Sequence, residues 1–202
     1  VPLYIRAAID VALTGQDRAI DMVEVSGDGF DDTHFMVMAG MGFDAAIMED
    51  TSEKLKARIG WTAYVPAGLK NLLVERFKAR VSIDGAPPMT VRARTVLIGN
   101  CGKLTGGINL MPDAEPDDGT LDIVVIAPKG LAAWVSVAAR VLAKSGRSTQ
   151  TLDRYRCRAI EVHVDHDQLV ELDGDIIGEA RHIEVEVQPR ALIVRTETGR
   201  TA

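Results

Sequence analysis

Acidic residues gather with glycines in three stretches of the chain, between segments of apolar, strand-like sequence. The stretches are residues 40–45 (GMGFDA), residues 99–122, and residues 171–175 (ELDGD). Ionised carboxylates in such loops can accept a proton from a reacting hydroxyl or bind a hard cation. Loops that carry function on a rigid β scaffold have this composition, so the candidate chemistry lies here and the strands must position it.

The last stretch contains Asp173 and Asp175 on either side of a glycine. Asp-Gly is a strong turn dipeptide, and in a turn Asp173 would cap backbone amides. A carboxylate held in such a loop can equally act as a general base. The residue types alone favour the turn.

The middle stretch offers carboxylates and glycines at close spacing. Asp117, Asp118 and Asp122 surround a glycine turn, and such a loop either binds a divalent cation or is a solvated acidic turn. Gly106 and Gly107 would let the backbone approach a phosphate or a headgroup closely, or they form a tight turn with positive φ. The sequence does not decide between a cation site and an acidic turn at the aspartates, or between ligand contact and a tight turn at the two glycines.

Composition narrows the class of protein. The chain has 202 residues, is 47% hydrophobic and 26% charged, and carries a net charge of −6, which argues against nucleic acid as a partner. A local basic patch for an anionic membrane surface is not excluded. Two cysteines favour free thiols in a reducing cytosol. The longest apolar stretch, residues 130–143, is too short to cross a bilayer.

Hydrophobic periodicity predicts a mainly β protein with packed helices (α+β), built as an antiparallel β-sandwich of about nine strands. Helices are predicted over residues 3–13, 45–58, 60–76 and 130–144. Strands are predicted over residues 20–25, 34–39, 79–84, 90–99, 121–127, 160–164, 169–172, 183–187 and 191–195.

Two further patterns have ordinary interpretations. His163, Asp165 and His166 look like metal ligands, but on a strand His166 falls on the other face from the first two, which favours a solvated strand end. Trp134 and its apolar neighbours could form a membrane-surface helix, although such a stripe usually packs in a core.

In their order and spacing the three stretches resemble the C-terminal domain of the diacylglycerol kinase and sphingosine kinase catalytic family, bacterial soluble lipid kinases in particular. In that family G-x-G-F-D-A, G-N, a glycine cluster, D-D-G-x-L-D and D-G-E follow one another. The resemblance extends from about Ile5 to about Thr196. The chain departs from the pattern at Thr105, where a first glycine is usual, and at Asp175, which replaces a glutamate.

The resemblance implies roles for individual residues. Asp173 matches the family position of the base that accepts the proton of the lipid hydroxyl as it attacks the γ-phosphate of ATP. Asp175, Gly106 and Gly107 would assist in binding the cofactor.

In some bacterial relatives Mg²⁺ binds in the loop of the D-D-G-x-L motif, which corresponds here to residues 115–122 and which we call the acidic loop. The corresponding ligands here would be the Asp118 side chain and the backbone of Glu115 and Thr120.

The family's G-G-D-G-T phosphate-binding motif is absent from the chain, and no P-loop or dinucleotide-binding motif replaces it. We therefore expect residues 1–19 to be a helical connector from an N-terminal nucleotide-binding domain, and residues 20–202 to form the β-sandwich. ATP and Mg²⁺ would bind mainly to the preceding domain. The chain alone is expected to be inactive.

The resemblance further implies a cytoplasmic enzyme that visits the inner face of the membrane transiently. Diacylglycerol is the expected acceptor. A sphingoid base, a polyprenol or a phospholipid stays open as the substrate, as does a non-catalytic lipid-binding regulatory module. A homodimer also stays open.

Overall fold

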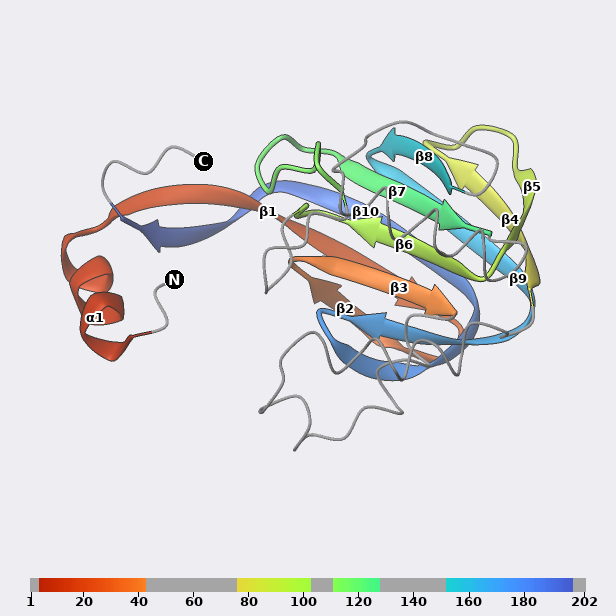
Figure 1. The fold of residues 1–202 in the computed structure, drawn as a ribbon, viewed down its shortest axis with the longest axis horizontal. Helices are drawn as coiled ribbons and strands as arrows, with labels where there is room; N and C mark the ends of the chain where they lie inside the picture. Colours follow the sequence, from red (N-terminus) through yellow and green to blue (C-terminus); the bar gives the residue numbers. More distant parts are fainter. Residues whose placement is uncertain (1–3, 43–75, 103–110, 128–151, 198–202) are drawn as a thin grey trace.

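The computed structural model describes residues 4–42, 76–102, 111–127 and 152–197 (Figure 1). They form one helix and ten strands. The elements are α1 (Ile5–Thr14), β1 (Gln16–Gly27), β2 (Phe30–Phe35), β3 (Met38–Gly42), β4 (Phe77–Ile83), β5 (Met89–Ala93), β6 (Thr95–Gly99), β7 (Leu121–Ile126), β8 (Leu152–Cys157), β9 (Ala159–Leu172) and β10 (Asp175–Thr196).

The strands form one antiparallel sheet in the order β2-β1-β10-β9-β3-β6-β7-β8, with β4 on β9 and β5 on β4. The long strand β9 connects two parts of this sheet, the pair β4–β5 and the run β3-β6-β7-β8. Its first residues pair with β4, and its last residues, up to Leu172, pair with β3. Figure 1 shows β9 and β10 running past both parts.

The larger of two core clusters in the described residues spans both parts of the sheet. It contains Val23 of β1, Ile98 of β6, Ile123 of β7 and Val185 of β10, all at most 2% exposed. Alternation produces this burial: Val185 points inward, while its neighbours Glu184 and Glu186 point to solvent. The predicted mainly β, antiparallel sandwich-like fold is confirmed.

The first predicted helix is confirmed as α1, which packs loosely at the far end of the β1–β10 ribbon (Figure 1). Val11 is its one buried residue. Strand β1 begins at Gln16, four residues before the expected domain boundary, and pairs there with Thr196. The helices predicted over residues 45–58, 60–76 and 130–144 lie outside the described residues.

Several predicted strand limits are wrong. The segment 34–39 is not one strand, because the chain turns at Met36 and Val37 between β2 and β3. The segment 90–99 breaks at Arg94. Before it, β5 pairs with β4; after it, β6 pairs with β3 and β7. Strand β8 was not predicted. Segments expected as separate strands merge into β9 and into β10, whose irregularities are β-bulges rather than ends.

Cys101 and Cys157 are free thiols, as predicted. Burial raises the pKa of both, that of Cys101 to about 11. In the part of the chain that the structure describes, no helix has the length and apolar composition needed to cross a bilayer.

Candidate functional site

The turn between β9 and β10 presents the carboxylate that the sequence singled out. Asp173 and Gly174 are the two residues between the paired Leu172 and Asp175. Their φ angles are 51° and 103°, and two positive values are what a type I′ hairpin turn requires. The turn is confirmed, and the Asp173 side chain is exposed.

The Asp173 carboxylate accepts hydrogen bonds from three consecutive amides of the β2–β3 turn. Oδ2 accepts the N–H of Met36 at 2.8 Å, and Oδ1 accepts those of Val37 and Met38 at 2.8 and 2.9 Å. The Asp173 amide donates in return to the Met38 carbonyl at 2.9 Å. A carboxylate has about four lone-pair positions, so Oδ2 has room for one further donor, such as a hydroxyl.

Amide capping by aspartate recurs in this protein. Asp84, also followed by a glycine and also at positive φ, accepts the N–H groups of Arg158 and Ala159 at 2.8 and 2.9 Å. Asp28 caps two amides of β10 in the same way. Asp173 differs by clamping three amides, with both oxygens in use. Capping is therefore a shared structural device, and the third amide and the position in the family pattern set Asp173 apart.

Asn100, of the G-N pair, holds the same turn from the other side. It is fully buried, and its Nδ2 donates to the Met36 carbonyl at 2.9 Å and to the Asp21 carbonyl at 3.3 Å. Its amide donates to the Val37 carbonyl at 2.9 Å. Asn100 thus connects the turn beside Asp173 to strand β1.

Asp21 extends this connection to the acidic loop. Its buried carboxylate accepts the amide of Gly119 on Oδ2 and that of Arg190 on Oδ1, both at 2.7 Å. We call the resulting set the motif network: Asp21, Met36–Met38, Asn100, Gly119 and Asp173. It joins the G-N, D-D-G and D-G-D motifs, which lie far apart in the sequence.

Sequence reasoning missed Asp21. The available signal was a carboxylate that interrupts the apolar pattern of Ile20, Met22 and Val23, since a buried charge needs specific partners. Of the expected cofactor residues, Asp175 is exposed at the first position of β10. Gly106 and Gly107 lie outside the described residues.

Each aspartate of the acidic loop lies beside an arginine. Asp117 accepts two hydrogen bonds from Arg18, the shorter at 2.8 Å. Asp118 forms a close ion pair with Arg156, whose Nε is also 3.7 Å from the Asp122 carboxylate. Burial raises the pKa of Asp122, and the guanidinium of Arg156 opposes that shift. The loop's negative charge is thus compensated by cations of the chain itself.

This arrangement does not fit a metal ion at Asp118 as it stands. Oδ1 of Asp118 accepts the amide of Thr120 at 2.9 Å and its hydroxyl at 2.7 Å, while Oδ2 is paired with Arg156. Glu115 is exposed in the same loop. A divalent cation held by Asp118 and the carbonyls of Glu115 and Thr120 would compete with the guanidinium. Metal binding here stays a prediction, and it requires Arg156 to move.

We expect Arg156→Gln to bind Mg²⁺ more tightly than the unmodified protein, because the substitution removes the competing cation and leaves Asp118 available. Thermal melting with Mg²⁺ or with chelator measures this: Mg²⁺ should stabilise Arg156→Gln more. Arg18→Gln is the matched control, since it frees Asp117 instead. If Asp118→Ala added to Arg156→Gln leaves the Mg²⁺ response intact, the ligand assignment is wrong.

Comparison with known proteins places the fold in a family. Residues 37–196 match the model of the "YegS C-terminal NAD kinase beta sandwich-like domain". An Enterobacter sp. (strain 638) protein named "Probable lipid kinase YegS-like" is 30% identical over 96% of this chain and 62% of its own length. A protein of the same name from Yersinia pestis (strain Pestoides F) is 28% identical, over 96% of this chain and 63% of its own.

Solved structures share the fold. The crystal structure of a diacylglycerol kinase from Bacillus anthracis str. Sterne superposes with a TM-score of 0.73 at 21% identity, covering 98% of this chain and 63% of that one. Another structure from that strain, titled a "putative diacylglycerol kinase", superposes with a TM-score of 0.75 at 20% identity, covering 100% of this chain and 65% of that one. The chain spans about three fifths of the length of its curated relatives. With four fifths of its residues matched, it belongs to the family of YegS C-terminal NAD kinase beta sandwich-like domains.

Proposed function

We propose that this chain is the C-terminal domain of an ATP-dependent lipid kinase, in which it holds the acceptor lipid and contributes Asp173 as the general base. Its membership of the YegS C-terminal family and the names of its curated relatives support a lipid kinase. The single observation that carries the role of Asp173 is its geometry. The carboxylate is exposed, fixed by three amides, and has one lone-pair position left on Oδ2.

Phosphoryl transfer needs positioning and charge neutralisation, with a carboxylate that accepts the hydroxyl proton. The proposed step follows from these requirements. The lipid hydroxyl donates a hydrogen bond to Oδ2 of Asp173, and its proton passes to that oxygen as the hydroxyl oxygen attacks the γ-phosphorus of ATP. The bond from that phosphorus to the β–γ bridging oxygen breaks, and ADP leaves. The amide clamp keeps the carboxylate in one orientation, so little freedom is lost when the reactants align.

ATP and Mg²⁺ are proposed to bind mainly to a nucleotide-binding domain that precedes this one in the full-length protein. Asp175, Gly106 and Gly107 are proposed to assist at the cleft between the two domains. Mg²⁺ would neutralise charge on the phosphates. Diacylglycerol is the proposed acceptor, which the enzyme would reach by transient contact with the cytoplasmic membrane surface.

We expect full-length protein to transfer phosphate from radiolabelled ATP to diacylglycerol in mixed micelles, while the 202-residue chain transfers none. The chain has a core of its own but no phosphate-cradling motif. A sphingoid base, a polyprenol and phosphatidylglycerol serve as alternative acceptors in the same assay. Transfer to one of these lipids instead would replace diacylglycerol as the proposed acceptor and would leave the proposed kinase activity in place.

Two outcomes would contradict the proposal. Transfer by the purified chain alone would show that the nucleotide site has been assigned to the wrong part of the protein. Lipid binding by the full-length protein, without transfer to any acceptor, would indicate a regulatory lipid-binding module.

A further inference from the structure

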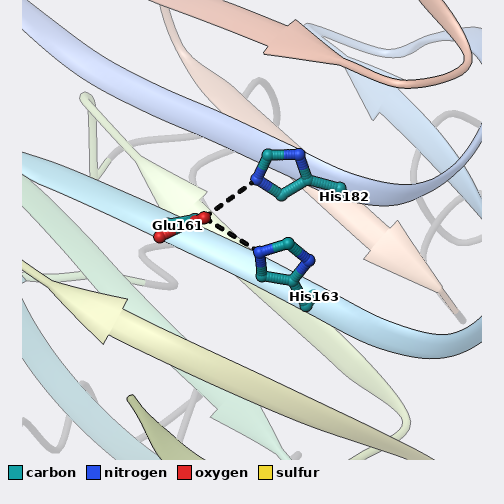
Figure 2. A group of neighbouring side chains, drawn as sticks. All are labelled: Glu161, His163 and His182. Carbon is teal, nitrogen blue, oxygen red and sulfur yellow. Dashed lines mark hydrogen bonds and ion pairs between the residues drawn. The ribbon is translucent and has the colours of Figure 1, made fainter. Parts of the chain in front are cut away.

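Two histidines and a glutamate from neighbouring strands converge on the outer face of the sheet. Glu161 and His163 are two residues apart on β9, so their side chains share one face. His182 of β10 is the cross-strand partner of His163, and Glu184 is the partner of Glu161. Figure 2 shows both imidazole rings turned toward the Glu161 carboxylate. The antiparallel register brings together residues that lie about twenty positions apart.

The three side chains meet at one oxygen atom. Nε2 of His163 lies 2.8 Å from Oε1 of Glu161, and Nε2 of His182 lies 3.1 Å from the same oxygen. The two rings are stacked, with centroids 4.0 Å apart and planes inclined by 9°. The hydrogen bond from His163 is the main cause that lowers the pKa of Glu161. The Glu161 carboxylate therefore lies at the edge of two stacked imidazoles, beside the Nε2 atom of each.

This geometry is close to that of a metal centre. One ligand atom from each of the three residues lies within 4.8 Å of the other two. Ligands at about 2.0–2.1 Å from a tetrahedral Zn²⁺ are about 3.3 Å from one another, so the nitrogen-to-oxygen separations need to widen only slightly. Glu184 is not part of that group, but its Oε1 is 3.5 Å from Nε2 of His182, so its side chain would have to turn toward the other two residues to become a fourth ligand.

The surroundings favour a cation that arrives from solvent. The side chains of the cluster are between 28% and 43% exposed. Beside them is a groove of about 340 Å³, and carboxylates predominate among its charged lining residues: Glu24, Asp32, Glu161, Glu184 and Glu186. Arg80 of β4 is the cross-strand partner of His163, and Lys78 lies on the same face of that strand. The five carboxylates outnumber these two cations, and a surface rich in one sign of charge concentrates the opposite ion.

We propose that Glu161, His163 and His182 bind a divalent transition-metal ion of the Zn²⁺ class, with Glu184 or water as the fourth ligand. Two imidazoles with carboxylate suit Zn²⁺, Co²⁺ or Ni²⁺, whereas Mg²⁺ and Ca²⁺ prefer sets of oxygen ligands. The ion replaces the two hydrogen bonds to Oε1 and joins β9 to β10 on the solvent side of the sheet. This site is independent of the proposed kinase chemistry.

Titration of the full-length protein with Zn²⁺ alone, followed by calorimetry and thermal melting, tests the proposal. We expect one saturable site and a melting temperature raised by about 5–10 °C at a hundredfold excess over Kd. Co²⁺ should give the visible absorption of a tetrahedral nitrogen and oxygen site. Any stabilisation by Mg²⁺ or Ca²⁺ should come from sites with oxygen ligands, so it should persist in His163→Ala and His182→Ala.

The variants identify the ligands. Glu161→Gln, His163→Ala and His182→Ala should each weaken Zn²⁺ binding by more than about tenfold, since each removes one ligand. His166→Ala is the matched control: it removes an imidazole from the same strand, one that is bonded to Asp165 at 2.9 Å. Melting without metal shows that each variant folds.

The proposal is overturned if Zn²⁺ gives no saturable site. It is equally overturned if His163→Ala and His182→Ala bind Zn²⁺ as tightly as the His166→Ala control. In either case the cluster is a hydrogen-bonded cross-strand pair of histidines on a solvated sheet face.

Discussion

Replacing Asp173 with asparagine in the full-length protein is expected to lower kcat of lipid phosphorylation by about 10²- to 10⁴-fold, the usual contribution of a general base. The amide nitrogen of asparagine cannot accept the hydroxyl proton. The loss should fall on kcat more than on KM, because the carboxylate is needed when the proton leaves and not when the lipid docks. Steady-state kinetics with varied lipid and saturating ATP measure both quantities.

The structure adds a stability effect to this variant. The asparagine carbonyl can keep the amides of Val37 and Met38, which Oδ1 now accepts, but its NH₂ group faces the amide of Met36. One hydrogen bond is lost, at a cost of about 1 kcal/mol. A fall in activity alone therefore does not identify a base, and the melting temperature must be measured beside kcat.

Asp84→Ala is the matched control. It removes two amide caps of the same kind, at another Asp-Gly turn, so it should lower the melting temperature at least as much as Asp173→Asn. Because Asp84 caps a different turn, kcat should be retained where the fold survives. If Asp84→Ala loses as much kcat as Asp173→Asn, the effect is structural and Asp173 is a cap. If Asp175→Asn costs more kcat than Asp173→Asn, the base is the other carboxylate of the turn.

Local sequence signals predict the parts of the fold whose causes are local. The alternation of Ile183, Val185 and Val187 with glutamates gives one buried and one solvated face, and the structure has both. Asp173-Gly174 predicts a turn because few other residue pairs tolerate two positive φ values. The family pattern further singled out three stretches, and the described parts of two of them meet in the motif network.

The end of β2 shows why other limits could not be read from the sequence. Residues Phe35 to Ala39 are apolar throughout and continue the strand pattern. The chain turns there because the Asp173 carboxylate, 135 to 137 positions away, accepts the amides of residues 36–38. A turn fixed by partners so remote leaves no mark in its own segment.

The arginine beside the acidic loop and the pairing of the two histidines could not be read from the sequence for the same reason. No residue near Asp118 in the sequence indicates that Arg156, 38 positions further along, is its partner. The guanidinium of Arg156 lies where a divalent cation was expected. The local sequence groups His163 with Asp165 and His166, whereas its partner in the structure is His182 on the neighbouring strand β10. Pairing register decides both sites, and register depends on bulges that single-strand patterns do not reveal.

Asp21→Ala is expected to destabilise the protein, by about 1–3 kcal/mol at the buried amide of Gly119 and by less at the part-buried amide of Arg190, because both donors lose their acceptor. Strands β1 and β10 change register at this residue: Ile20 pairs with Leu192 and Met22 with Gln188, so three residues of β10 oppose Asp21 alone. Arg190, in that bulge, has φ of 56°, and the Asp21 carboxylate accepts its amide together with that of Gly119.

Urea unfolding of Asp21→Ala, compared with Asp17→Ala on the same strand, measures this effect. The Asp17 carboxylate is 62% exposed and pairs with Arg195 at 2.9 Å, and exposed ion pairs of this kind contribute little, so its loss should leave the unfolding midpoint nearly unchanged. Asp21→Asn should fall between the two variants, since one oxygen remains to accept one amide. If Asp21→Ala unfolds at the urea concentration of Asp17→Ala, the two amides have found other acceptors and Asp21 does not hold the acidic loop to the sheet.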